Sequence, residues 1–108
     1  MLNRNYQMQS TQTNPYLVQK IMTASPEQLI AYVYDAAVSA CARQDHARAL
    51  EAVQELVNSL NYEAGEVSKN FHNIYQHVLT LLHDRQFEEA RKLLTDLRQT
   101  WKTAMNLN

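Results

Sequence analysis

Histidine and cysteine are the residue types in this chain that most readily bind metals or act as nucleophiles. The histidines are His46, His72, His77 and His83, and Cys41 is the single cysteine. His72 and His77 are five residues apart, and His77 and His83 are six apart. A metal-binding pair on one helix face needs a spacing of about four residues, as in H-E-x-x-H. The spacing therefore argues against a metal site and favours surface or boundary positions for the histidines.

The carboxylate pairs also lack the setting of general acid–base chemistry. Glu51 and Glu55, and Glu88 and Glu89, have the spacings of ordinary charges on a helix surface. A glycine-rich phosphate loop is disfavoured because the chain contains one glycine. A small enzyme would need a convergent polar pocket, and nothing in the sequence indicates one. We therefore do not expect an enzyme.

The charge balance weighs against a nucleic-acid or anionic-membrane surface. The formal net charge is −1, whereas a basic excess is typical of proteins that bind such surfaces. Four basic residues near the carboxyl end are interleaved with acidic ones and indicate a solvated helix face. They are Arg91, Lys92, Arg98 and Lys102.

Cysteine usage and hydropathy predict a soluble cytoplasmic protein. Cys41 has no second cysteine with which to form an internal disulfide, so a reducing compartment fits best. The opening residues MLNRNYQMQSTQTNP lack the apolar segment and cleavage site of a secretory signal peptide. No apolar run approaches the roughly 18 residues that a membrane span requires.

The composition predicts one all-helical domain. The 108 residues contain one glycine and two prolines, and helix-forming side chains are abundant. Residues 1–14 are mostly polar and are expected to form a flexible amino-terminal tail. The domain is then expected to span residues 15–108, and to begin with a short helix or apolar strap at residues 16–22.

The segment SPEQ has the features of a helix start. Ser25 suits the N-cap, Pro26 the first helical position, and Glu27 the positive end of the helix dipole. Gln28 stands three residues after Ser25, which completes a capping box. The first long helix is therefore expected at about 26–44.

Three further amphipathic segments follow, with short connections. Asp45 is the expected N-cap of the second helix, and Gly65 its expected stop. The third helix begins near Glu66, and the fourth carries an apolar stripe from Phe87 to Ala104. Trp101 lies on that stripe, so its indole N–H needs a partner near the bundle end. Four helices with short loops predict an antiparallel up-and-down four-helix bundle.

The first long helix has more apolar residues than one helix face needs. Leu29 and Val33 form one row with Ala36 and Ala40, while Ile30 and Tyr34 belong to the next row. The apolar arc is wider than the roughly 100° stripe of a surface helix. Either the helix is central in the bundle, or part of the arc lies in a groove for a partner.

A weak internal similarity suggests an alternative function. QDHARALEAVQEL at 44–56 resembles RQFEEARKLLTDL at 85–97, with a spacing of about 41 residues that is near the period of some helical repeats. Two units are too few for a solenoid, and two amphipathic helices with one packing problem explain the similarity as well. A generic helical adaptor for another partner is therefore the second functional hypothesis.

Three ordered segments resemble the flagellar secretion chaperone (FliS) family. NPYLVQKIMTASPEQLIAYVYDAA at 14–37 is similar to its N-A-Y, T-A-S-P-E-x-L and L-Y-D-G-A elements. LNYEAGEVSKNFHNIYQHVLTLL at 60–82 and LTDLRQTW at 94–101 are similar to its later elements. The resemblance spans residues 14–105. The chain departs from the pattern with Pro15 after Asn14 and with Ala36 in place of the usual glycine.

The resemblance implies a cytoplasmic four-helix bundle that binds the carboxy-terminal segment of flagellin. It implies that binding prevents early polymerisation and aids delivery to the type III export gate, without catalysis or cofactor. A homodimer is also compatible with an exposed groove.

The resemblance also suggests which residues bind flagellin. Leu29, Val33 and Ala40 are assigned to the core, and Asp35 to a cap or bridge. The candidates for the strap and groove are Tyr16, Ile21, Ile30, Tyr34, Tyr75, Leu79 and Leu82.

Overall fold

The computed structural model describes residues 15–61 and 65–107, and these residues form helices and no strand. The helices are α2 (Pro15–Met22), α3 (Pro26–Ala42), α4 (His46–Asn58), α5 (Glu66–His83) and α6 (Phe87–Ala104). The prediction of an all-α fold is therefore confirmed. The predicted flexible tail at 1–14 lies outside the described residues.

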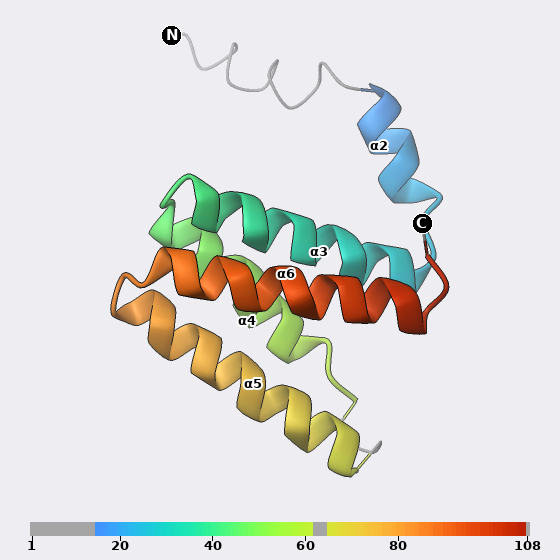
Figure 1. Cartoon of the computed structure of the whole chain (residues 1–108). Coiled ribbons are helices and arrows are strands. Elements are labelled where there is room, and N and C mark those ends of the chain that lie inside the picture. Colours follow the sequence, from blue (N-terminus) through green and yellow to red (C-terminus); the bar gives the residue numbers. More distant parts are fainter. Residues whose placement is uncertain (1–14, 62–64, 108) are drawn as a thin grey trace, which may run out of the picture.

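The four longer helices pack in a ring of neighbours. α3 contacts α4 and α6, and α5 contacts the same two helices. Figure 1 shows α3 and α6 side by side, with α5 diverging from α6 toward the amino end of α5. The short helix α2 projects from the body, and none of its residues is buried.

Side-chain caps begin two of the helices as predicted. The Ser25 hydroxyl accepts the backbone N–H of Gln28 at 3.1 Å, with Pro26 at the first helical position. The Asp45 carboxylate accepts the backbone N–H of Arg48 at 3.2 Å. These bonds satisfy amide groups that have no partner inside the helix, and so they fix where α3 and α4 begin.

The expected role of Gly65 as the stop of the second helix is wrong. Helix α4 already ends at Asn58, where Ser59 is the C-cap and its hydroxyl donates to the Leu56 carbonyl at 2.7 Å. Gly65 instead precedes α5, with φ 76° and ψ −129°. This backbone conformation is open mainly to glycine, so the single glycine serves the entry into α5.

The core lies where the four longer helices meet. Small residues on α3 let the neighbouring helices approach closely, and larger aliphatic side chains fill the space between them. Ala40 is fully buried, as predicted for a core residue. The buried hydrophobic residues are Ala31, Tyr34, Ala37, Ala40, Cys41, Ala49, Ala52, Val53, Leu56, Val57, Tyr75, Val78, Leu82, Ala90 and Leu94.

Polar contacts tie α6 to α3 at the surface. Arg98 Nη1 lies 3.1 Å from the Asp35 carboxylate, which gives Asp35 the bridging role expected from its motif position. The Trp101 indole N–H donates to the Glu27 carbonyl at 2.9 Å. This bond provides the partner that Trp101 was predicted to need, and it holds the end of α6 against the start of α3.

Candidate functional site

An apolar groove lies between α2, α3 and α4. Leu29, Tyr32 and Val33 follow the i, i+3, i+4 spacing of one helix face, and this face of α3 borders the hollow. We call this hollow the α3–α4 groove, and its volume is about 460 Å³. Its lining residues are Ile21, Leu29, Tyr32, Val33, Ala36, Arg48, Glu51, Ala52 and Glu55.

The floor of the α3–α4 groove is apolar and comes from α3. Leu29 is 39% exposed, so its expected place in the core is wrong. Val33 is partly buried and packs against the core while its remaining surface lines the groove. Ala36, which stands where the family pattern has glycine, adds a methyl group to the same lining.

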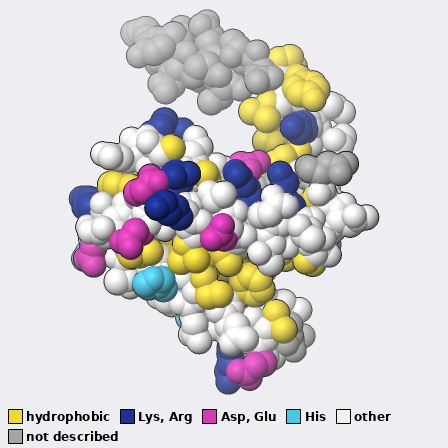
Figure 2. All heavy atoms as spheres, in the orientation of Figure 1, with side chains coloured by type: hydrophobic (Ala, Val, Ile, Leu, Met, Phe, Trp, Pro, Cys, Tyr) yellow, Lys and Arg dark blue, Asp and Glu magenta, His cyan; other side chains and the backbone are white. Residues whose placement is uncertain are grey.

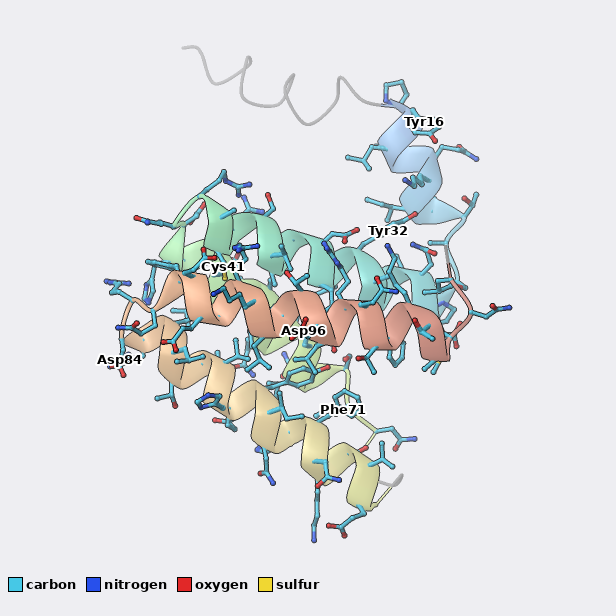
Figure 3. The ribbon with its side chains drawn as sticks, in the orientation of Figure 1. Tyr16, Tyr32, Cys41, Phe71, Asp84 and Asp96 are labelled. Carbon is cyan, nitrogen blue, oxygen red and sulfur yellow. The ribbon has the colours of Figure 1, made fainter. Side chains whose placement is uncertain are left out.

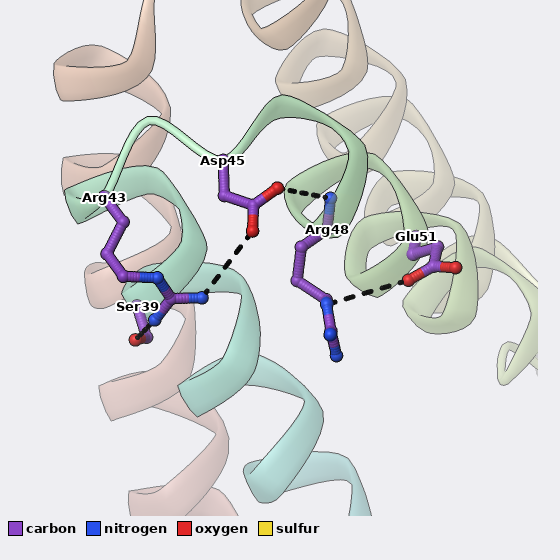
Figure 4. Close-up of polar contacts among 5 residues, drawn as sticks. All are labelled: Ser39, Arg43, Asp45, Arg48 and Glu51. Carbon is purple, nitrogen blue, oxygen red and sulfur yellow. Dashed lines mark hydrogen bonds and ion pairs between the residues drawn. The ribbon is translucent and has the colours of Figure 1, made fainter. Parts of the chain in front are cut away.

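The wall of the α3–α4 groove is charged and comes from α4. Arg48 Nε lies 3.9 Å from Glu51 Oε1, and Figure 4 shows this pair next to the turn between α3 and α4. Asp45, in the turn before α4, accepts the backbone N–H of Arg48 and lies 3.9 Å from the Arg43 guanidinium. Glu55 lies one helical turn beyond Glu51 on the same wall.

Helix α2 stands over one side of the groove. Its Lys20 Nζ is 5.5 Å from the centroid of the Tyr32 ring, a distance typical of a cation–π contact. Ile21 contributes to the groove lining, while Tyr16 lies near the far end of α2 (Figure 3). Figure 2 shows the hydrophobic surface that α2 presents to solvent. Its exposed hydrophobic residues are Tyr16, Leu17, Val18, Ile21 and Met22.

A smaller hollow opens where α5 diverges from α6. Its volume is about 210 Å³, and Ile30, Phe71 and Trp101 form much of its apolar lining. Ser68 closes one side by donating to the Asn61 carbonyl at 2.5 Å. Figure 2 shows hydrophobic side chains gathered between α6 and α5. We call this hollow the α5–α6 cleft.

A tyrosine pair lies beneath the α5–α6 cleft. The hydroxyls of Tyr34 and Tyr75 are 2.6 Å apart, and the two side chains are almost completely buried. Burial raises the pKa of both hydroxyls above the ordinary tyrosine range, because it disfavours the charged phenolate. The pair is therefore neutral and joins α3 to α5 by one hydrogen bond.

Burial also explains why the single cysteine is not a reactive site. Cys41 is 2% exposed, and desolvation raises the pKa of its thiol, although the charge of Arg91 partly offsets this. A thiol in that state is a poor nucleophile. Within the described ranges, no three His, Cys, Asp or Glu side chains gather in a way that would hold a metal ion.

The structure separates the predicted site residues into three groups. Tyr16 and Ile21 are exposed on α2, at 75% and 44%. Ile30 and Tyr75 come together in the lining of the α5–α6 cleft. Tyr34 and Leu82 are core residues, and Leu79 is partly buried against the core. Tyr75 belongs to the core as well as to the cleft lining.

Tyr75, Leu79 and Leu82 form one apolar stripe of α5, and this stripe, predicted to belong to the groove, faces the core. The adjacent stripe contributes to the core at Val78, which is fully buried, but its first residue Val67 is 61% exposed. Amphipathic periodicity cannot decide between two adjacent stripes, because that choice depends on how α5 is rotated against α4 and α6. Contact of Tyr34 or Leu82 with flagellin stays a prediction, and it would require the core to open.

The sequence reasoning missed most of the lining of the α3–α4 groove. Tyr32 was the available signal, because it falls outside both apolar rows of its helix. The charged wall residues gave no signal, since Arg48, Glu51 and Glu55 have the spacing of any exposed helix face.

Comparison with known proteins identifies the family. A family model described as Flagellar protein FliS matches residues 42–108, which is more than half of the chain. The match covers α4, α5 and α6 but begins after the TASPEQL segment. No curated protein and no solved structure matches the chain. Across the residues that the structure describes, no helix has the length and apolar character to cross a membrane. The chain belongs to the FliS family of flagellar secretion chaperones.

Proposed function

We propose that this protein is a cytoplasmic export chaperone for flagellin. In this proposal it binds the disordered carboxy-terminal segment of flagellin, prevents premature polymerisation, and aids delivery to the flagellar type III secretion apparatus. Membership of the FliS family supports this function. Residues 15–108 would act as one domain in which α3 to α6 form an antiparallel up-and-down four-helix bundle.

The observation that carries the proposal is the α3–α4 groove. It is an open apolar hollow of about 460 Å³ on an all-helical body, and exposed hydrophobic side chains of α2 lie beside it. Contiguous apolar surface on a small soluble protein is a mark of a docking site. A groove between helices suits the apolar face of an amphipathic helix.

A disordered ligand fits such a surface for a thermodynamic reason. A segment that folds on binding loses conformational entropy, and burial of its apolar side chains must offset that loss. Separate hollows on one body let one chain wrap around the body and bury several anchors. The α5–α6 cleft, with Ile30 and Tyr75 in its lining, would accept a second anchor.

In this proposal, the predicted site residues on α2 and in the α5–α6 cleft keep their predicted role of contacting flagellin. Tyr16 and Ile21 would contact flagellin from α2, and Ile30 and Tyr75 from the cleft. Leu79 is partly buried against the core and is not among the cleft-lining residues, so its contact with flagellin stays a prediction. Tyr34 and Leu82 would contact the ligand only if binding opens the core. Other proposed partners are components of the export gate and a second copy of the chain.

Calorimetric titration with a peptide of the organism's flagellin carboxyl terminus tests the proposal. We expect binding at or below tens of micromolar, roughly −6 to −8 kcal/mol. Burial of apolar surface should give a negative heat-capacity change, and helical circular dichroism should increase. The peptide in scrambled order is the control. A folded protein that binds neither peptide would contradict the proposal and favour the generic helical adaptor.

A further inference from the structure

The two sides of the α3–α4 groove differ in chemistry. Leu29, Tyr32 and Val33 make the α3 side apolar, whereas the α4 side carries Glu51 and Glu55. From Leu29 to Ala36 the groove follows α3 for seven residue-to-residue steps, or roughly 10 Å along the helix axis. This length suits about two turns of a ligand helix, with one flank of that helix against the acidic wall.

The α4 side of the groove carries two carboxylates, Glu51 and Glu55, but one basic residue, Arg48. Arg48 pairs with Glu51 at 3.9 Å. Glu55 is seven residues from Arg48, about two helical turns away, and the structure gives its carboxylate no ion pair among the described residues. On the α2 side, Lys20 lies over the Tyr32 ring.

The position of Glu55 within α4 is unfavourable for the free protein. It is in the last turn of a helix that ends at Asn58, where the helix dipole is negative and a carboxylate is repelled. It also lies four residues after Glu51, a like-charge spacing that destabilises helices. No basic residue occupies the last turn of α4. The Glu55 carboxylate therefore does not stabilise α4 in the free protein. A positive charge on a bound partner would offset its repulsion by the helix dipole and by Glu51.

We propose that Glu55 is a specificity-determining residue of the α3–α4 groove. It pairs with a lysine or arginine on the flank of an amphipathic segment whose apolar face fills the groove. This inference rests on the proposed function, and it adds a chemical requirement to the flagellin segment. A segment with an apolar face but no flanking basic residue then binds more weakly.

The substitution Glu55→Gln tests the pairing, with Glu89→Gln on the exposed face of α6 as the matched control. We expect Glu55→Gln to bind the flagellin peptide about two- to fivefold more weakly at low salt, the range of a partly exposed ion pair. Thermal stability should stay equal or rise, because a like-charge repulsion is removed. Glu89→Gln should leave the affinity unchanged.

Ionic strength gives a second readout. Between about 50 and 300 mM salt, screening should weaken binding to the wild-type protein more than binding to Glu55→Gln. Charge reversal gives a third readout. Glu55→Lys should lose affinity for the wild-type peptide and regain it with a peptide in which the paired basic residue is glutamate.

The outcomes separate this inference from the proposed function. A wild-type protein that binds no flagellin peptide overturns the proposed function, and this inference with it. A wild-type protein that binds the peptide, with equal affinity and equal salt dependence for Glu55→Gln, overturns the role of Glu55 alone. Undiminished binding of a peptide whose lysines and arginines are all replaced by glutamine also overturns it.

Discussion

At the scale of single residues, the Tyr34–Tyr75 pair combines packing with one buried hydrogen bond. Their ring centroids are 6.5 Å apart and tilted by 58°, and the hydroxyls meet at 2.6 Å. Each hydroxyl is buried, so each depends on the other for its hydrogen bond. Removing both hydroxyls is therefore expected to cost less than the sum of the two single removals.

A double-mutant cycle checks this expectation. Tyr75→Phe should destabilise the protein by about 1–3 kcal/mol, because the Tyr34 hydroxyl stays buried without its partner. Tyr34→Phe with Tyr75→Phe should cost less than the sum of the single changes by more than about 0.5 kcal/mol. Urea unfolding followed by circular dichroism measures these free energies. Additive effects would mean that the hydroxyls do not interact.

At the scale of helices, three helix ends share one geometry. Gln44, Arg85 and Asn106 have φ values of 56°, 61° and 59°, after α3, α5 and α6. At the first of these, the N–H of Gln44 bonds to the Cys41 carbonyl and the N–H of Asp45 to the Ala40 carbonyl. This is the Schellman pattern, in which glycine is the usual left-handed residue.

The repeated turn accounts for the internal similarity of the sequence. Segments 44–56 and 85–97 each begin with a left-handed residue and continue into a helix, α4 or α6. Equivalent positions have equivalent packing, since Ala49 and Ala90 are both fully buried. The similarity is therefore explained by two helix hairpins that have the same turn and bury the same helix face, and a repeat architecture is not required.

Glycine at a left-handed position should stabilise the protein. Arg85→Gly is expected to raise the free energy of unfolding by about 1 kcal/mol, because glycine has no Cβ to clash at φ 61°. In a domain of this size, such a change raises the melting temperature by roughly 4–8 °C. Lys92→Gly, inside α6, is the control and should lower stability by about 1 kcal/mol. Calorimetric melting distinguishes these results.

At the scale of the whole molecule, the wide apolar arc of α3 serves two surfaces. Ala37 and Ala40 face the core, whereas Leu29 and Tyr32 line the α3–α4 groove. The packing of α3 in the core accounts for one part of the arc, and the other part lines a groove whose use by a partner stays a prediction. The proposed docking function depends on this division.

The same substitution at two leucines should separate the core from the groove. Leu82→Asp buries an unpaired charge in the core, and its cost is comparable to the total stability of roughly 5–15 kcal/mol, so we expect unfolding. Leu29→Asp lies at a 39% exposed position, and we expect a folded protein that no longer binds the flagellin peptide. Circular dichroism and calorimetric titration measure both. Unchanged peptide binding by Leu29→Asp would exclude the groove as the docking site.

The sequence by itself determined the features that depend on neighbouring residues. The caps at Ser25 and Asp45, the all-α composition and the need of Trp101 for a partner follow from local hydrogen bonding and propensity. The ordered motifs also identified the family. The rotation of each helix about its own axis was decided only in the tertiary structure. That rotation buried Tyr34 and Leu82 and left Leu29 at the surface. Periodicity alone does not distinguish two adjacent apolar stripes, because packing against the neighbouring helices determines which stripe is buried.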